Sequence, residues 1–127
     1  MNAPSSGMLF EDESYAIRGA VFEVYSQLGA GFAEPVYQEA LEMEFALLPF
    51  EAQKPIRIAY KGRELSQTYR ADILCFGKII LELKSVRVLL PEHEAQLVNY
   101  LKAGAFRLGF LINFSHVPLV DIRRYVN

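Results

Sequence analysis

The sequence lacks several features that would assign it to a common class of protein. It has a single cysteine, Cys75, which cannot form an internal disulfide and lies in an apolar stretch typical of a core strand. No apolar run reaches the roughly 18–20 residues of a membrane span. Residues 1–7 have neither the basic start nor the apolar stretch of a signal peptide. We therefore expect a reducing, cytoplasmic location and no membrane partner.

A large net charge is also absent. The formal charge of −2 does not by itself point to a nucleic-acid partner. The distribution is uneven, because eight acids and one base up to Phe50 give −7, whereas seven acids and twelve bases from Glu51 onward give +5. This asymmetry fits either a basic face beside an acidic one or solvated helices packed beside a sheet, and both interpretations stay open.

The length and the apolar periodicity predict one mixed domain. With 127 residues, 52% of them hydrophobic, the chain is long enough to bury a core. We interpret residues 1–12 as a mobile arm and residues 13–127 as a single domain. The element order indicates an α/β or α+β fold. Helices are expected over about 14–28, 35–48 and 91–102, and four or five strands over 56–60, 69–76, 79–84, 108–114 and, as an edge strand, 120–125.

Three charged residues interrupt two of these apolar strands. Asp72 lies in the strand that ends near Phe76, and Glu82 and Lys84 lie in the next. Charges in such positions are costly to bury unless they are paired or bind a metal. Two carboxylates suit a divalent cation such as Mg²⁺, and a lysine two residues past a carboxylate lies on the same strand face. The pattern therefore favours metal-assisted phosphodiester hydrolysis.

The hairpin between these strands sets a geometric condition for such a site. A two-residue loop would pair Asp72 with Leu83 and place the two acids on opposite faces. An odd loop of Phe76-Gly77-Lys78 would pair Asp72 with Glu82. We predict the odd loop, or a bulge with the same effect.

Polar residues on two expected helices extend the candidate site. His93, Gln96 and Tyr100 form one stripe of the third helix, which is either part of a site or a half-buried helix edge. Glu34 precedes Pro35 at the start of the second helix. It is either a cap worth about 1 kcal/mol or a third carboxylate aimed at a metal.

Together these residues resemble a known family. Residues 31–37 match the G-x-x-E-x-x-Y signature of the GxxExxY protein family. The likeness covers the chain from about 15 to 124. That family is grouped with the PD-(D/E)xK nuclease superfamily, whose core is a mixed sheet flanked by helices. Ala71 stands where the motif name has proline, a position that varies in the superfamily. The likeness continues through residues 69–72, 82–84, 96–102 and 109–114.

The resemblance implies roles for the candidate residues. Asp72 and Glu82 resemble the metal-binding acids, Lys84 the catalytic lysine and Glu34 the acid on the first core helix. Gln96 and Tyr100 resemble the Q-x-x-x-Y element of the RecB-like branch and would position the substrate or the metal ligands. A Mg²⁺ or Mn²⁺ ion would polarise the scissile phosphate and activate a water molecule. The implied partner is nucleic acid, with DNA expected.

Two other interpretations compete with a nuclease. The chain could be a non-catalytic module that binds nucleic acid or protein on a nuclease-like fold. Alternatively, Lys84 could neutralise Asp72 or Glu82 in a purely structural ion-pair cluster. A homodimer and an activating protein partner are left open as well.

Overall fold

The described part of the chain folds around one sheet. A computed structural model describes residues 9–127, which form three helices and five strands. The helices are α1 (Glu11–Leu28), α2 (Glu34–Glu44) and α3 (Pro91–Gly104). The strands are β1 (Phe50–Tyr60), β2 (Arg63–Cys75), β3 (Ile79–Lys84), β4 (Leu108–Asn113) and β5 (Asp121–Val126).

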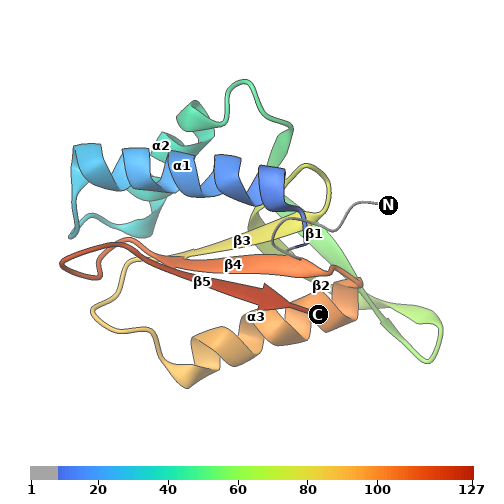
Figure 1. Ribbon diagram of the computed structural model, residues 1–127. Coiled ribbons are helices and arrows are strands. Elements are labelled where there is room, and N and C mark those ends of the chain that lie inside the picture. The colour runs from blue at the N-terminus through green and yellow to red at the C-terminus, as the bar shows by residue number, and fades with distance from the viewer. Residues whose placement is uncertain (1–8) are drawn as a thin grey trace.

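The strands lie side by side in the order in which they occur along the chain, β1-β2-β3-β4-β5 (Figure 1). Neighbouring strands are antiparallel except for β3 and β4, which run parallel. The parallel pair requires a crossover connection, and α3 supplies it. The fold is therefore α+β with a mixed five-stranded sheet, as predicted.

The helices cover the two faces of the sheet. Helices α1 and α2 lie on one face and α3 lies on the other (Figure 1). The sheet accordingly separates two apolar cores, one against α1 and α2 and one against α3. Strand β4 is buried along its whole length because both of its faces are covered.

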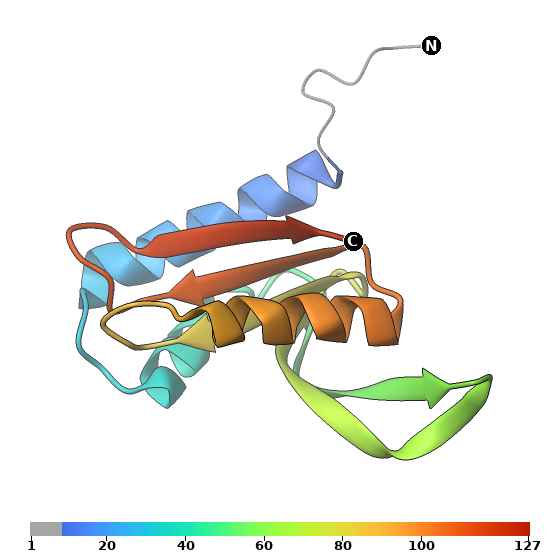
Figure 2. The ribbon, with the colours of Figure 1, turned by 90° about the horizontal axis from the view of Figure 1, so that it is seen from below.

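Strands β1 and β2 continue beyond the sheet as a two-stranded hairpin. Figure 2 shows this hairpin extending away from the body of the molecule. Residues 59–68 are all exposed, and Lys61-Gly62 forms the turn. The expected strand over 56–60 is thus much longer and begins at Phe50, and the expected strand over 69–76 begins at Arg63.

The start of the domain differs from the prediction. Residues 1–8 of the predicted mobile arm lie outside the described residues. Glu11 and Asp12, also assigned to that arm, instead form the first turn of α1, where negative charge is favoured by the helix dipole. The single-domain boundary at residue 13 stays a prediction. None of the helices in residues 9–127 combines the length and apolar character of a membrane span.

Candidate active site

The loop between β2 and β3 has three residues, Phe76, Gly77 and Lys78. The printed register pairs Cys75 with Ile79, Leu74 with Ile80 and Ile73 with Leu81. Phe76 and Gly77 take positive φ angles of 56° and 68°, which close the turn and which glycine adopts without strain. The predicted odd loop is therefore confirmed.

The backbone hydrogen-bond ladder between β2 and β3 ends at the Ile73–Leu81 pair, one residue before Asp72 and Glu82. Beyond it, the two carboxylates bond to the backbone of the opposite strand. The Leu83 amide donates to Asp72 Oδ2 at 2.7 Å, and the Asp72 amide donates to Glu82 Oε2 at 3.3 Å. Ala71 packs on the α3 side of the sheet while Ile73 packs on the other, so regular alternation is broken at Asp72. Each acid thus bonds to the backbone of the other strand at the point where β2 and β3 separate.

The two acids carry an electrostatic cost in this position. Burial and the Asp72 charge raise the pKa of Glu82 to about 7. Burial and the Glu34 charge also raise the pKa of Asp72, although its hydrogen bond from Leu83 acts in the opposite direction. The Lys84 charge lowers both pKa values but does not cancel the rise. Burial is the largest cause of both pKa shifts, and the charge of a neighbouring acid adds to each.

None of the ion pairs among residues 9–127 includes Asp72, Glu82 or Lys84. The structure thus gives no support to a purely structural ion-pair cluster, because Lys84 lies farther than ion-pair distance from both acids.

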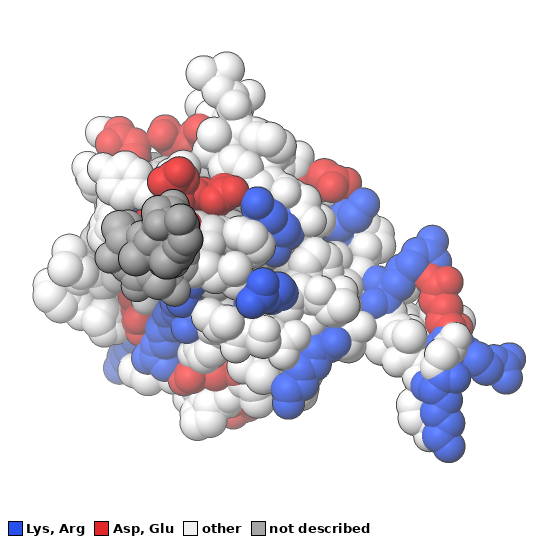
Figure 3. All heavy atoms as spheres, turned by 45° about the vertical axis from the view of Figure 1, so that its right-hand side comes forward, with Lys and Arg blue, Asp and Glu red and all other residues white. Residues whose placement is uncertain are grey.

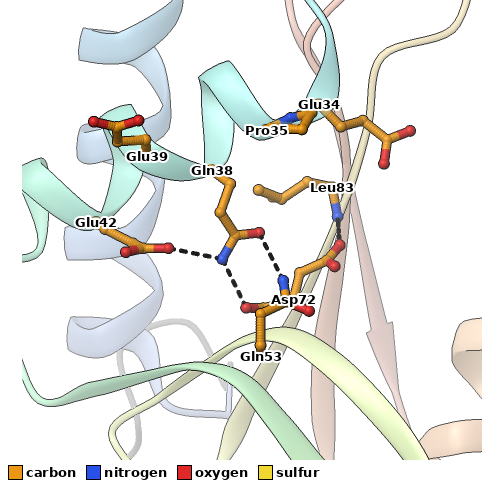
Figure 4. Close-up of a pocket in the computed structure, with 8 residues that line it drawn as sticks. All are labelled: Glu34, Pro35, Gln38, Glu39, Glu42, Gln53, Asp72 and Leu83. Atoms are coloured by element: carbon orange, nitrogen blue, oxygen red, sulfur yellow. Dashed lines mark hydrogen bonds between the residues drawn. The ribbon is translucent and has the colours of Figure 1, made fainter.

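A pocket of about 590 Å³ opens beside Asp72, between α2 and the sheet (Figure 4). Glu34, at the start of α2, lines the same pocket, whereas Glu82 and Lys84 do not. The described residues contain no group of three or more His, Cys, Asp or Glu side chains placed to hold a metal ion. The structure therefore brings Asp72 together with Glu82 and, on its other side, with Glu34, without gathering all three.

Glutamine side chains that the sequence did not single out hold the pocket wall. Gln38 Nε2 donates to the Asp72 carbonyl at 2.9 Å and to Glu42 at 3.0 Å (Figure 4). Gln53 donates to the Gln38 side-chain oxygen at 3.3 Å. Gln38 lies one position past Tyr37 of the signature, but nothing in its spacing indicates a contact with a strand 34 residues away.

On the α3 side, stacked tyrosines connect Gln96 and Tyr100 to Glu82. Gln96 donates to the Tyr100 hydroxyl at 2.8 Å. The Tyr100 and Tyr69 rings stack with centroids 3.3 Å apart, and the Tyr69 hydroxyl donates to Glu82 Oε2 at 2.7 Å. Burial and the Glu82 charge raise the Tyr69 pKa, so this phenol stays protonated as a donor. Tyr69 is thus a site residue whose role the sequence did not reveal.

His93 does not join this group. Its Nδ1 accepts the Leu90 amide at 3.0 Å and caps the start of α3. Of the other two residues of the stripe, Gln96 is exposed and Tyr100 is half-buried. For His93 the structural interpretation is therefore the one that the contacts support.

The signature tyrosine fixes the loop that precedes Glu34. The Tyr37 hydroxyl donates to the Gly29 carbonyl at 2.5 Å and accepts the Phe32 amide at 3.2 Å, and its ring stacks on Phe114. The Gly31 amide donates to Ser115 at 3.2 Å on the other side of the loop. The G-x-x-E-x-x-Y signature therefore describes a loop held in place by its own tyrosine, with Glu34 at its end.

Removing the Tyr37 hydroxyl tests this role. Tyr37→Phe is expected to lower the free energy of unfolding by about 0.5–1.5 kcal/mol, because the partly exposed Phe32 amide and Gly29 carbonyl lose their hydrogen bonds to the hydroxyl. Denaturant unfolding followed by circular dichroism measures the change. Tyr15→Phe is the matched control, since Tyr15 is 82% exposed and should show almost no effect. Equal stability of the two variants would contradict the assignment.

Buried Asn113 holds the segment that follows Lys84. It is fully buried at the end of β4, where its side chain accepts the Val86 amide at 3.0 Å and donates to the Val86 carbonyl at 2.8 Å. It also accepts the Ser115 amide. A buried amide bonded in this way orients backbone with little freedom, so Asn113 fixes the exit of β3 beyond Lys84.

The fold and the paired acids define a nuclease-like α+β domain. The family model described as the PD-(D/E)XK nuclease superfamily matches residues 11–125, and the chain belongs to that superfamily. No curated protein matches the sequence. The narrower resemblance to the GxxExxY family stays a prediction.

A solved structure described as "Crystal structure of SSO0001" has a similar fold. The TM-score is 0.58 with 20% sequence identity, over 93% of this chain and 60% of the other. The chain thus spans 60% of that protein's length. At this level of identity the likeness concerns the fold.

Proposed function

We propose that this chain hydrolyses phosphodiester bonds of nucleic acid, with DNA as the expected substrate and Mg²⁺ or Mn²⁺ as the cofactor. The observation that carries the proposal is the Asp72–Glu82 pair. These acids lie next to each other, half-buried, with raised pKa values, and no basic side chain of residues 9–127 lies within ion-pair distance of them. Membership of a nuclease superfamily that generally uses divalent metals supports the same chemistry.

The donor set fits a hard divalent cation. Asp72 and Glu82 provide carboxylate oxygens at a place where positive charge would offset their repulsion. Glu34 is the proposed third acid, because it shares the pocket with Asp72 and its charge acts on the Asp72 pKa. When bound, the cation would supply the charge that polarises the phosphate and activates the attacking water.

The other residues have roles that follow from their contacts. Lys84, on β3 two residues past Glu82, would stabilise negative charge on the reacting phosphate. Gln96 and Tyr100 would position the substrate backbone or the ligands of the metal, and Tyr69 would orient Glu82 through its hydrogen bond. Together these groups would act on one phosphodiester without covalent chemistry by the protein.

The alternative is a non-catalytic module that binds nucleic acid or protein. It is favoured by one observation, namely that residues 9–127 hold no ready group of three metal-binding side chains. In that case the acids would be retained without a cation, and neither Mg²⁺ nor Mn²⁺ would bind.

A cleavage assay separates the two functions. The purified chain is incubated with single- and double-stranded DNA and RNA in Mg²⁺, Mn²⁺ or EDTA, and metal binding is measured by calorimetry. We expect cleavage with either metal, none in EDTA, and metal binding that Asp72→Asn weakens. Absence of both cleavage and metal binding would identify the module as non-catalytic.

A further inference from the structure

The hairpin arm, defined as residues 57–68 of β1 and β2, contributes only the half-buried Ile58 to the apolar cores. Eleven of its twelve residues are exposed, all except Ile58. Figure 3 shows it standing out from the body of the protein, with basic and acidic side chains on its surface. Its charged residues are Arg57, Lys61, Arg63 and Glu64. An isolated two-stranded hairpin gains little stability from its own contacts. Core packing therefore does not account for the length of the arm, and we look for a function on its surface.

The arm is a two-stranded ribbon with a register irregularity between Arg57 and Ala59 and a tight turn at its end. Tyr60 pairs with Arg63 across a two-residue turn in which Lys61 and Gly62 have φ angles of 51° and 74°. Positive φ at both positions is typical of the type I′ turn, which matches the twist of the strands. From the Ile56–Tyr69 pair at its base to the turn, the arm is about 15 Å long, at roughly 3.3 Å per residue.

The arm is directly connected to the candidate active site. Tyr69, at its base, stacks on Tyr100 and donates to Glu82, and Asp72 lies three residues further along the same strand. Arg63, beside the turn, is nine residues from Asp72 along β2, which at about 3.3 Å per residue is roughly 30 Å. A rigid, rod-shaped substrate that lies along the arm and spans this distance would therefore reach from the turn to Asp72.

The charge of the arm suits a polyanion. Arg57 forms an ion pair with Glu64, whereas Lys61 and Arg63 have no acidic partner within ion-pair distance in the described structure. The Lys61 ammonium lies 5.4 Å from the centre of the Tyr60 ring, and Tyr60 is 61% exposed. The pocket beside Asp72 is lined instead by four acids, Glu34, Glu39, Glu42 and Asp72. Favourable charge for a phosphate backbone thus lies on the arm rather than in the pocket.

We propose that the hairpin arm enters the major groove of double-stranded DNA and holds the duplex against the active site, with Lys61 and Arg63 on the phosphates. This inference rests on the proposed nuclease function and names its substrate class. The major groove of B-form DNA, about 12 Å wide, admits a two-stranded ribbon. The major groove of A-form RNA is deep and narrow and does not. The shape of the arm therefore selects duplex DNA.

Binding is tested separately from cleavage. Anisotropy of a labelled DNA duplex of two helical turns is titrated with the full chain in EDTA at several salt concentrations. Lys61→Asn/Arg63→Gln removes the arm charges while asparagine keeps the positive φ at residue 61 accessible. Affinity is expected to fall on the order of 10-fold or more near 0.1 M salt, and the slope of log affinity against log salt to decrease by up to about 2.

Matched controls separate position from charge. Arg18→Gln removes one positive charge from an exposed position on α1, against Arg63→Gln on the arm. We expect Arg63→Gln to lower the slope by about 1 and Arg18→Gln to leave it unchanged. An RNA duplex should bind more weakly, and the arm variants should change its affinity little. Circular dichroism checks that each variant is folded.

The outcomes distinguish failure of the arm from failure of the nuclease. Arm-dependent DNA binding without cleavage in Mg²⁺ or Mn²⁺ would support the arm and refute the nuclease. Cleavage with binding and salt slope unchanged in the arm variants would overturn the arm alone. A dimer that the double variant converts to a monomer, with DNA affinity unaltered, would assign the arm to contact with a second copy and also overturn this inference.

Discussion

Lys84→Ala, Asp72→Asn and Glu82→Gln are each expected to reduce metal-dependent cleavage by at least about 100-fold. Loss of one group that stabilises charge in a transition state costs a factor on the order of 10²–10³. Asn and Gln are chosen for the acids because Asp72 accepts the Leu83 amide and Glu82 accepts the Tyr69 hydroxyl, so an oxygen acceptor must remain. Initial rates on the best substrate of the cleavage panel, with saturating metal, measure the effect.

The matched control for the lysine is Lys102→Ala, because Lys102 is exposed in the last turn of α3. It should cleave like the wild type, and all variants should unfold cooperatively. Wild-type rates in any one of the three site variants would remove that residue from the mechanism. Equal losses in Lys84→Ala and Lys102→Ala would reduce the effect to one of overall charge.

Glu82→Gln is expected to stabilise the metal-free protein at high pH and to have little effect at low pH. The carboxyl titrates near 7 when folded and near 4.5 when unfolded. Below about pH 4.5 it is protonated in both states and contributes nothing. As the pH rises to 7 the unfolded state loses its proton first, so wild-type stability falls. Above about pH 7 the full penalty applies, about 3 kcal/mol for such a shift.

Unfolding in denaturant from pH 4.5 to 8.5 with EDTA measures this difference. The control, Glu23→Gln, removes an acid that is exposed on α1 and should not reproduce the pH-dependent gain. Mg²⁺ or Mn²⁺ at pH 8 should stabilise the wild type through binding and Glu82→Gln much less. A wild-type stability that rises from pH 5 to 8, with no gain in Glu82→Gln, would contradict the placement of Glu82.

The elements that were located correctly from the sequence are those whose signal lies in residues close together along the chain. Apolar spacing predicted α1 up to residue 28 and the strand β4. Turn parity predicted the three-residue loop after which Cys75 pairs with Ile79. The acids beyond the last pair of this register are joined by a hydrogen bond from the Asp72 amide to Glu82. The exposed first half of β2, residues 63–68, was missed, because residues such as Arg63, Glu64 and Ser66 lack the apolar alternation by which strands are recognised.

The residue types of the site and the local geometry of its loops can thus be read from the chain, because they depend on side-chain chemistry and short-range spacing. The packing across the sheet determines which groups meet. The break in alternation at Asp72 turns its carboxylate toward the Leu83 amide. Gln38 reaches the Asp72 carbonyl from another element, and Tyr69 links Glu82 to Tyr100. Such contacts join residues far apart in sequence, and no local pattern records the distance or the burial that raises the Glu82 pKa.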